Sequence, residues 1–187
     1  MGEAMQAAGR PRSEQARLAV LRAVDDMLVE HGYAAMTMKG IAERAGVGRQ
    51  TVYRWWSSKA EILLEASAAD AARELAVVPQ ADPVAEVAAF LAGLSAFLTS
   101  SDAGLAYRAL LGEAQHDATV ARLLRGSDIL GDAARAVVGR LIARGTLSGD
   151  PEALAAELVG PTLYRILADG EPVDDAESRR MAGRFLR

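Results

Sequence analysis

One segment near the start of the chain constrains the fold more than any other feature. Residues 37–59 read TMKGIAERAGVGRQTVYRWWSSK. The spacing of the apolar side chains predicts a helix over 37–45, Gly46 supplies a tight turn, and a second helix follows from about Gly48 to Trp55. Small and apolar residues would pack both helices against an earlier one: Ile41, Ala42, Ala45, Val47 and Val52. We therefore expect a helix-turn-helix whose second helix keeps its polar leading edge free.

The segments on either side also predict helices. Over residues 13–31 the apolar side chains recur on one side of a helix, and Gly32 stands where a C-terminal cap with positive φ is expected. Ser58 and Glu61 form a capping box, in which the serine oxygen and the carboxylate each accept from a backbone N–H. A longer helix should begin there and break near Pro79.

Further along, one start signal occurs twice. Asp82-Pro83 and Asp150-Pro151 each combine an acidic N-cap with a proline at the first helical position, where its missing N–H costs nothing. Other helices are predicted over about 102–115, 117–125, 127–144, 151–169 and 174–186. Nine or ten helices and no convincing strand indicate an all-α fold.

Composition supports this fold class. The 187 residues are 51% hydrophobic and 25% charged, as in a globular protein with a sizeable core. Aromatic residues are only 5% and alanine, the best helix former, is abundant. Without cysteine there is no disulfide, thiol nucleophile or thiolate metal site, which fits a cytoplasmic location. No uncharged apolar stretch approaches the roughly 18 residues of a membrane span.

Charge divides the chain into two parts. Residues 1–60 hold nine Lys/Arg against six Asp/Glu, and residues 61–187 hold twelve against nineteen, so the parts carry +3 and −7. This split permits a basic face for nucleic acid on an acidic body. We divide the chain into a flexible basic arm over 1–12, a helix-turn-helix DNA-binding domain over 13–60 and a helical domain over 61–187. Arg10 and Arg12 would reach a minor groove or the DNA backbone from the arm, or belong to a simple tail.

Enzymatic activity is disfavoured by the residue pattern. His31 and His116 are the only histidines, and no Gly-rich phosphate loop or metal-ligand spacing occurs. The adjacent carboxylates of Asp25-Asp26 and Asp174-Asp175 point to different sides of their helices. We therefore expect no catalytic residues, no cofactor and no metal. The alternative to a DNA-binding protein is a helical scaffold or protein-interaction module that does not use its helix-turn-helix.

Over residues 13–64 the chain resembles the tetracycline-repressor (TetR) family of bacterial regulators. The matching residues are Glu30-His31-Gly32-Tyr33, Thr37, Ile41-Ala42, Ala45-Gly46-Val47, Val52-Tyr53 and Lys59 after the bulky Trp56. The Trp55-Trp56 pair departs from the family, which usually has phenylalanine at the second position and often histidine at the first. The resemblance implies a ligand-responsive transcriptional regulator, commonly a repressor, that binds a pseudo-palindromic operator as a homodimer and is released by a small molecule.

The resemblance, together with position on the second helix, assigns candidate DNA contacts. Arg49, Gln50, Thr51 and Arg54 are the candidates for base edges, because arginine can bond guanine bidentately and glutamine can bond adenine. Thr37, Tyr53 and Lys59 match positions that touch phosphates in the family. Tyr53 could instead be partly buried, and Arg54 could be a solvated surface charge.

By the same resemblance, residues 61–187 would bind the effector and form the dimer. The candidate pocket residues are Phe90, Leu94, Phe97, Tyr107, Leu111, His116 and Tyr164. The candidate dimer residues mark one side of the penultimate helix, and are Leu154, Leu158, Pro161, Thr162 and Ile166. For both sets the alternative is burial within the core of a single chain. We expect no membrane partner.

Overall fold

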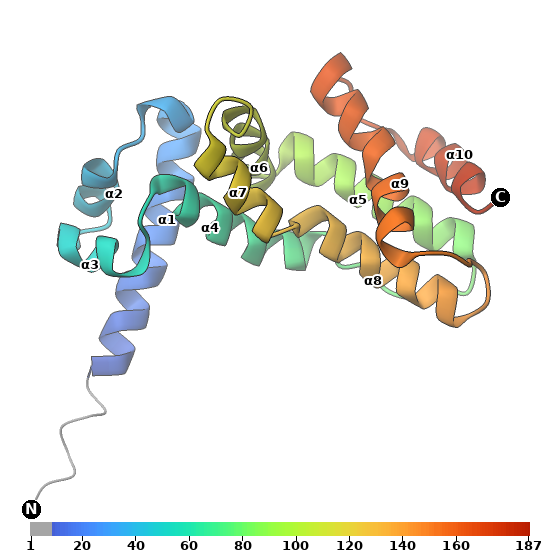
Figure 1. Cartoon of the computed structure of the whole chain (residues 1–187), viewed down its shortest axis with the longest axis horizontal. Helices are drawn as coiled ribbons and strands as arrows, with labels where there is room; N and C mark the ends of the chain where they lie inside the picture. Colours follow the sequence, from blue (N-terminus) through green and yellow to red (C-terminus); the bar gives the residue numbers. More distant parts are fainter. Residues whose placement is uncertain (1–8) are drawn as a thin grey trace, which may run out of the picture.

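The computed structural model describes residues 9–187, with side chains from Ser13 onward. Within that range the protein has ten α-helices, one π-helical turn and no strand, so the predicted all-α fold is confirmed (Figure 1). The elements are α1 (Gly9–Ala35), α2 (Met38–Arg44), α3 (Arg49–Trp55), α4 (Lys59–Glu74), α5 (Pro83–Ser100), α6 (Asp102–Glu113), α7 (Ala118–Gly126), α8 (Ile129–Ala143), α9 (Pro151–Tyr164), η1 (Arg165–Asp169) and α10 (Asp175–Phe185).

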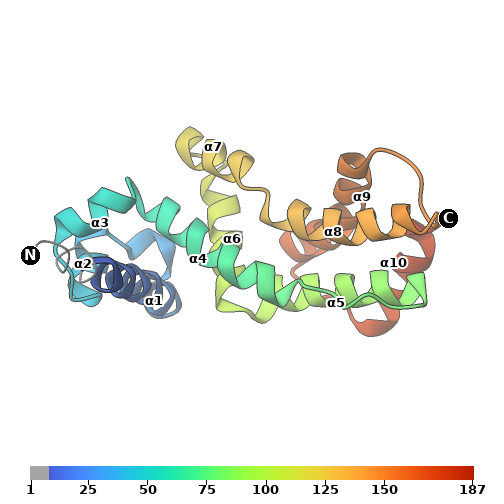
Figure 2. The same cartoon turned by 90° about the horizontal axis from the view of Figure 1, so that it is seen from below.

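The molecule is elongated, with two groups of helices at its ends. Helices α1, α2 and α3 form a small module at one end, and α5, α8, α9 and α10 form a bundle at the other (Figures 1 and 2). Helix α4 runs from the module into the body, where it lies beside α8. Helix α6 touches α1, α4 and α5, so it fills the junction between the two groups.

The predicted helix boundaries mostly hold because their signals are local. Gly32 adopts a φ of 73° and interrupts α1 where the cap is predicted. The Ser58 hydroxyl accepts from the Glu61 N–H, and Asp82 and Asp150 cap the helices that begin with their prolines. Helix α1 differs at its start, because residues 9–12 are helical and extend it beyond the predicted range. Residues 1–8 of the predicted arm lie outside the described residues.

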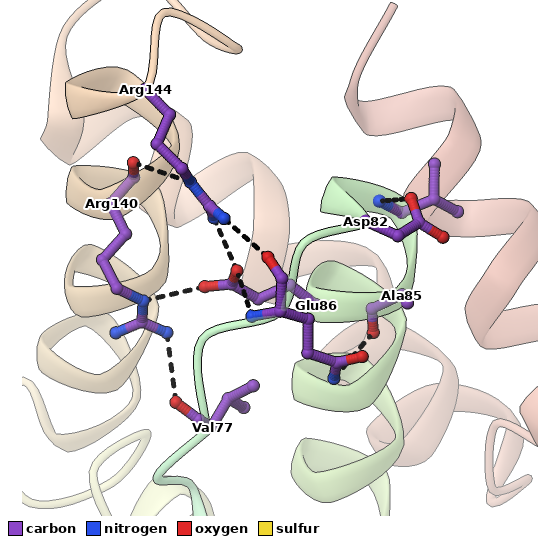
Figure 3. A network of polar contacts seen from close by, with 8 residues as sticks. Val77, Asp82, Ala85, Glu86, Arg140 and Arg144 are labelled. Atoms are coloured by element: carbon purple, nitrogen blue, oxygen red, sulfur yellow. Dashed lines mark hydrogen bonds and ion pairs between the residues drawn. The ribbon is translucent and has the colours of Figure 1, made fainter.

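Helix α4 also differs from its prediction, because it ends at Glu74, well before Pro79. The residues that follow are held extended by a buried carboxylate, Glu86, near the start of α5 (Figure 3). Glu86 accepts from Arg140 Nε at 2.8 Å, from Arg144 Nη2 at 2.5 Å and from the backbone of Gln80 at 3.0 Å. The same two arginines also donate to carbonyls of the extended segment. The segment is therefore fixed onto α8.

This network predicts a loss of stability when its only carboxylate is neutralised. We expect Glu86→Gln to lower the free energy of unfolding by about 2 kcal/mol in urea denaturation, because hydrogen bonds to charged groups contribute about 1.5–3 kcal/mol each and both arginines can still reach water. Burial acts to raise the pKa of Glu86, but the hydrogen bonds from Gln80, Arg144 and Arg140 outweigh it and the pKa is lowered.

A lowered carboxyl pKa sets the pH dependence of this effect. Because the folded state holds the proton more weakly than the unfolded state, the contribution of Glu86 is present above its ordinary pKa and disappears as pH falls below it. The difference between wild type and Glu86→Gln should therefore be large at pH 7 and small near pH 3. Glu152→Gln is the control, since Glu152 pairs with Arg135 at the exposed surface and should cost under about 1 kcal/mol. Equal losses from both variants would contradict the prediction.

Helix α5 is also the one helix within residues 9–187 that is long and apolar enough to cross a membrane by length and composition. Half of this stretch is buried inside the fold. It packs against α10, α6 and α9, and it carries the ion-paired Glu86. We therefore interpret α5 as the core helix of the bundle.

The junction between module and body contains an unfavourable charge. Asp25 of α1 has a buried carboxylate oxygen, Oδ1, that accepts no hydrogen bond. Burial raises the pKa of Asp25 to about 6, and nearby Asp70 of α4, Asp102 of α6 and Asp26 add to the effect. Since the folded state binds this proton more tightly, stability should fall as pH rises from about 4 to 6 and stay lower above that range.

Removing the charge on Asp25 should therefore stabilise the protein at neutral pH. We expect Asp25→Asn to raise the melting temperature at pH 7.5 and to have little effect at pH 4, as measured by circular dichroism. Asp26→Asn is the matched control, because the neighbouring carboxylate is exposed and lies 3.7 Å from Arg44. A lower melting temperature for Asp25→Asn at pH 7.5 would show that the charged form makes a favourable contact.

Candidate nucleic-acid interface

The helix-turn-helix is built as its sequence predicts. Ile41, Ala42 and Val52 are almost fully buried and hold α2 and α3 against the rest of the module. Gly46 turns the chain with a φ of 66°, and the Val47 N–H donates to the Ala42 carbonyl at 3.0 Å. A left-handed φ favours glycine, because it has no Cβ to clash. The turn thus fixes the angle at which α3 leaves α2.

The beginning of α3 is not covered by the protein. Arg49 and Gln50 are exposed, Thr51 is half-buried, and the N-cap Gly48 contributes no side chain. The Arg49 guanidinium lies 3.8 Å from the Glu43 carboxylate, with both side chains more than half exposed. Exposed pairs of this kind contribute about 0–1 kcal/mol, so the arginine can leave for another partner at little cost.

The two tryptophans at the end of α3 have different environments. Trp56 is buried, and its indole N–H donates to Glu65 of α4 at 2.8 Å. Trp55 is half-buried and meets the Trp56 ring edge-on, with centroids 5.4 Å apart. The Arg54 guanidinium lies 5.1 Å from the Trp55 ring centroid, within cation–π range. Trp55 therefore supports an arginine on the exposed face of α3, a contact that the sequence did not reveal.

Two of the three predicted phosphate contacts are accessible. Tyr53 is 56% exposed, so partial burial does not describe it. Thr37 is exposed and caps α2, where its hydroxyl oxygen accepts from the Gly40 N–H at 3.0 Å. Its hydroxyl proton remains available to donate.

Lys59, the third predicted phosphate contact, also makes contacts within the protein. Its Nζ donates to the Tyr33 carbonyl at 2.8 Å and to the Met36 carbonyl at 3.1 Å, and it lies 4.0 Å from the centroid of the Tyr33 ring. The ammonium group is thus directed toward these two carbonyls, and the side chain is only partly exposed. The sequence showed a cation next to the motif, but it could not show which way the cation points.

Most of the predicted effector-pocket residues are core residues. Phe90, Leu94 and Phe97 are at most 1% exposed, and Tyr107 is buried, with a pKa that burial and Asp128 raise to about 12. These side chains fill the interior and do not line a cavity together. The remaining three candidates diverge: Leu111 is partly buried, His116 is exposed in the turn between α6 and α7, and Tyr164 is exposed at the end of α9.

A hollow of about 360 Å³ instead lies between α4 and α8. Its lining is mainly apolar, with one carboxylate and one guanidinium, and consists of Ala68, Ala72, Leu75, Ala76, Val77, Ile129, Asp132, Ala133, Ala136, Val137 and Arg140. Sequence reasoning missed it because alanines carry no signal that separates a pocket wall from a packed core. Asp132 bonds to Arg135, and Arg140 bonds to Glu86, so both charges in the lining are paired.

The predicted dimer residues fall on two sides of α9. Leu158, Thr162 and Ile166 are 0–2% exposed within their own chain, so they cannot contact a partner directly, and Leu154 is half-buried. Pro161 is exposed. Their selection followed the apolar side of the helix, and α9 packs within its own chain on α8 and α5. Tyr164 is also exposed, and Pro161 and Leu158 both line a groove that α9 forms with Leu91 of α5 and with Met181, Arg184 and Phe185 of α10.

Comparisons with known proteins agree with this architecture. The family profile described as "Bacterial regulatory proteins, tetR family" matches residues 20–66, which include the helix-turn-helix. The profile described as "Tetracyclin repressor-like, C-terminal domain" matches residues 80–185, which form most of the body. Together the two matches cover both groups of helices.

Individual relatives extend over nearly the whole chain. The uncharacterized HTH-type transcriptional regulator YdeS of Bacillus subtilis (strain 168) is 33% identical over 177 residues, which are 91% of this chain and 88% of YdeS. The crystal structure of the TetR family transcription regulator SCO0332 has a TM-score of 0.78 at 29% identity and covers 92% of this chain and 97% of that one. The structure of the transcriptional regulator SCO7518 from Streptomyces coelicolor A3(2), at 24% identity, shares the fold with a TM-score of 0.66, over 92% and 98% of the two chains. The protein therefore belongs to the TetR family of helix-turn-helix transcriptional regulators, and it is a DNA-binding regulator and not an enzyme.

Proposed function

We propose that the protein binds a pseudo-palindromic operator as a homodimer, represses transcription there, and is released by a small molecule. The observation that carries this proposal is the uncovered start of α3, where Arg49 and Gln50 are exposed on a rigidly packed helix. A scaffold would have no need to keep these polar side chains free. The major groove accepts a helix presented in this way.

The side chains on α3 have separate roles in this proposal. Arg49, Gln50 and Thr51 contact base edges from the first turn, and Arg54, supported by Trp55, contacts a base or the adjacent backbone. Tyr53 and Thr37 donate hydroxyl hydrogen bonds to phosphates, which position the helix without reading sequence.

The dimer would form through the exposed side of α9 together with α10. Tyr164 is 70% exposed and Leu167 is 49% exposed, and because residues three apart on a helix are neighbours they form an exposed apolar patch of the kind that marks an interface. Pro161 lies one turn before Tyr164 and borders the groove formed with Met181 and Phe185 of α10. A twofold axis here would set two copies of α3 about 34 Å apart, one turn of duplex.

The hollow between α4 and α8 is the proposed effector site. Its apolar walls with a few polar groups are typical of small-molecule sites. To move the population from 1:99 to 99:1, an effector must favour one state by about 5.5 kcal/mol. The hollow meets this requirement only if its shape differs between the states, and α4, which forms one wall and begins at the DNA-binding module, is the element that would differ.

The decisive experiment selects bound duplexes from a random pool with the purified protein. We expect two related half-sites in opposite orientation, spaced by about one helical turn. Enrichment of a single half-site would argue against the dimer. If no duplex is enriched and no salt-sensitive mobility shift is seen, the scaffold alternative is favoured.

Tyr164→Asp tests the dimer interface, and it should convert the dimer to a monomer in analytical ultracentrifugation. A dimer that persists would place the interface elsewhere.

A further inference from the structure

Lys59 makes contacts within the protein that a lysine serving only to bind DNA phosphate would not need. Its ammonium group donates two hydrogen bonds to backbone carbonyls, of Tyr33 and Met36, and lies 4.0 Å from the centroid of the Tyr33 ring. The side chain is only partly exposed, and burial lowers its pKa. An ammonium has three donors, so two carbonyls and an aromatic face occupy most of its surroundings.

The two carbonyls lie at the end of the first helix and in the linker that follows it: Tyr33 is in the last residues of α1, after the interruption at Gly32, and Met36 is in the linker to α2. The Tyr33 carbonyl already accepts from the Met36 N–H at 3.2 Å, whereas Met36 lies beyond the end of α1 and is only 2% exposed, which limits the access of water to its carbonyl. Leaving such a group without a donor costs about 1–3 kcal/mol. Lys59 supplies the donor from the first turn of α4.

Lys59 therefore connects the start of α4 to the residues just before α2. The relative position of these two segments must be fixed if α3 is to enter a groove at a defined angle. The linker leads directly into α2, and α2 positions α3 through the turn at Gly46. Helix α4 begins just after α3 ends. Thus the Lys59 contacts join the two ends of the helix-turn-helix: the residues that precede α2 and the start of α4, which follows α3.

We propose that Lys59 is a positioning residue for DNA binding, which fixes the first turn of α4 to the linker between α1 and α2 and so sets the orientation of α3. This proposal rests on the proposed operator binding. It differs from a phosphate contact, which could use the one ammonium N–H that the two carbonyls leave free, and the two roles are separated by their dependence on DNA sequence and on salt. A positioning residue should affect sequence-specific binding far more than sequence-independent binding.

The test compares Lys59→Met, which keeps the aliphatic stem, with Lys59→Arg, which keeps donors and the aromatic contact. Affinity for the duplex selected by the wild-type protein and for a scrambled duplex of equal length is measured by fluorescence anisotropy over a range of salt concentrations. We expect Lys59→Met to weaken the selected duplex by about 10-fold or more while its scrambled-duplex affinity and salt slope stay at wild-type values. Lys59→Arg should restore most of the selected-duplex affinity.

Two outcomes would overturn the proposal. For the scrambled duplex, the slope of log affinity against log salt concentration could become shallower by about 0.9 per protomer in Lys59→Met. This result would identify a phosphate contact. A lower melting temperature with unchanged selected-duplex affinity would leave Lys59 a merely structural role.

A second measurement needs no DNA. Amide hydrogen exchange of the free protein should speed up about 10-fold at Met36 and Gly40 in Lys59→Met, because both amides lie in the segment that Lys59 holds. Failure of the wild-type protein to bind any duplex would refute the proposed function, whereas unchanged exchange would refute the positioning role by itself.

Discussion

Replacing Arg49 by alanine should weaken binding of the selected operator by at least about 30-fold. A bidentate contact to guanine contributes about 1–3 kcal/mol of discrimination, and a twofold dimer loses it twice. The structure supports a large effect, because Arg49 is exposed at the first position of α3 and gives up only a weak contact with Glu43 on binding. Fluorescence anisotropy against the selected duplex measures the loss.

Gln50→Ala should behave differently from a general loss of charge. Because glutamine can bond adenine bidentately, the variant should change preference at particular base pairs and leave the affinity for scrambled DNA unchanged.

Arg180→Ala is the control for the loss of net charge in Arg49→Ala, since Arg180 is an exposed arginine on α10 at the opposite end of the molecule. If Arg49→Ala and Arg180→Ala lower the affinity for the selected duplex equally, Arg49 does not contact base edges.

Gly104→Ala should be strongly destabilising, because Gly104 of α6 lies against the backbone of α5. A Cβ at Gly104 would lie 1.8 Å from the Phe97 carbonyl oxygen and 2.5 Å from the Phe97 carbonyl carbon. Both atoms are backbone of α5, so no side-chain rotation can relieve the clash. We expect a loss of more than about 3 kcal/mol and a melting temperature lower by about 10 °C, measured by calorimetry.

The same helix offers a matched control for this effect. A Cβ at Gly112 of α6 would meet nothing within 4 Å. Because alanine has a higher helix propensity, Gly112→Ala should stabilise the protein by up to about 1 kcal/mol. Opposite signs for the two variants would show that close approach of α5 and α6, and not helix propensity, decides the outcome at Gly104. Similar small effects would mean that the start of α6 can shift.

The sequence predicted the features that depend on neighbouring residues. Caps at Ser58, Asp82 and Asp150 and the turn at Gly46 are determined within four residues of each site, so local chemistry suffices. The exposed start of α3 could be anticipated for the same reason, because its polar residues directly follow the turn.

Features that depend on distant parts of the chain could not be predicted. Glu86 meets Arg140 and Arg144 across more than 50 residues, and the same arginines hold the segment that follows α4. The apolar stripe of α9 indicated an interface, but periodicity cannot distinguish a partner chain from the core of the same chain. Lys59 was assigned to a phosphate by its match to the family, whereas its contacts with the carbonyls of Tyr33 and Met36 depend on residues 23 or more positions away and could not be read from the sequence.

The straight course of α4 has a mechanical consequence. Its 16 residues make a rod of about 24 Å, with the Lys59 contacts at one end and the hollow against α8 near the other. A sideways displacement of about 2 Å at the hollow corresponds to a tilt of about 5° over this length. In a symmetric pair the two copies of α4 would tilt in opposite senses. The spacing between the two copies of α3 would therefore change by twice the displacement within one chain, while each helix-turn-helix kept its internal shape.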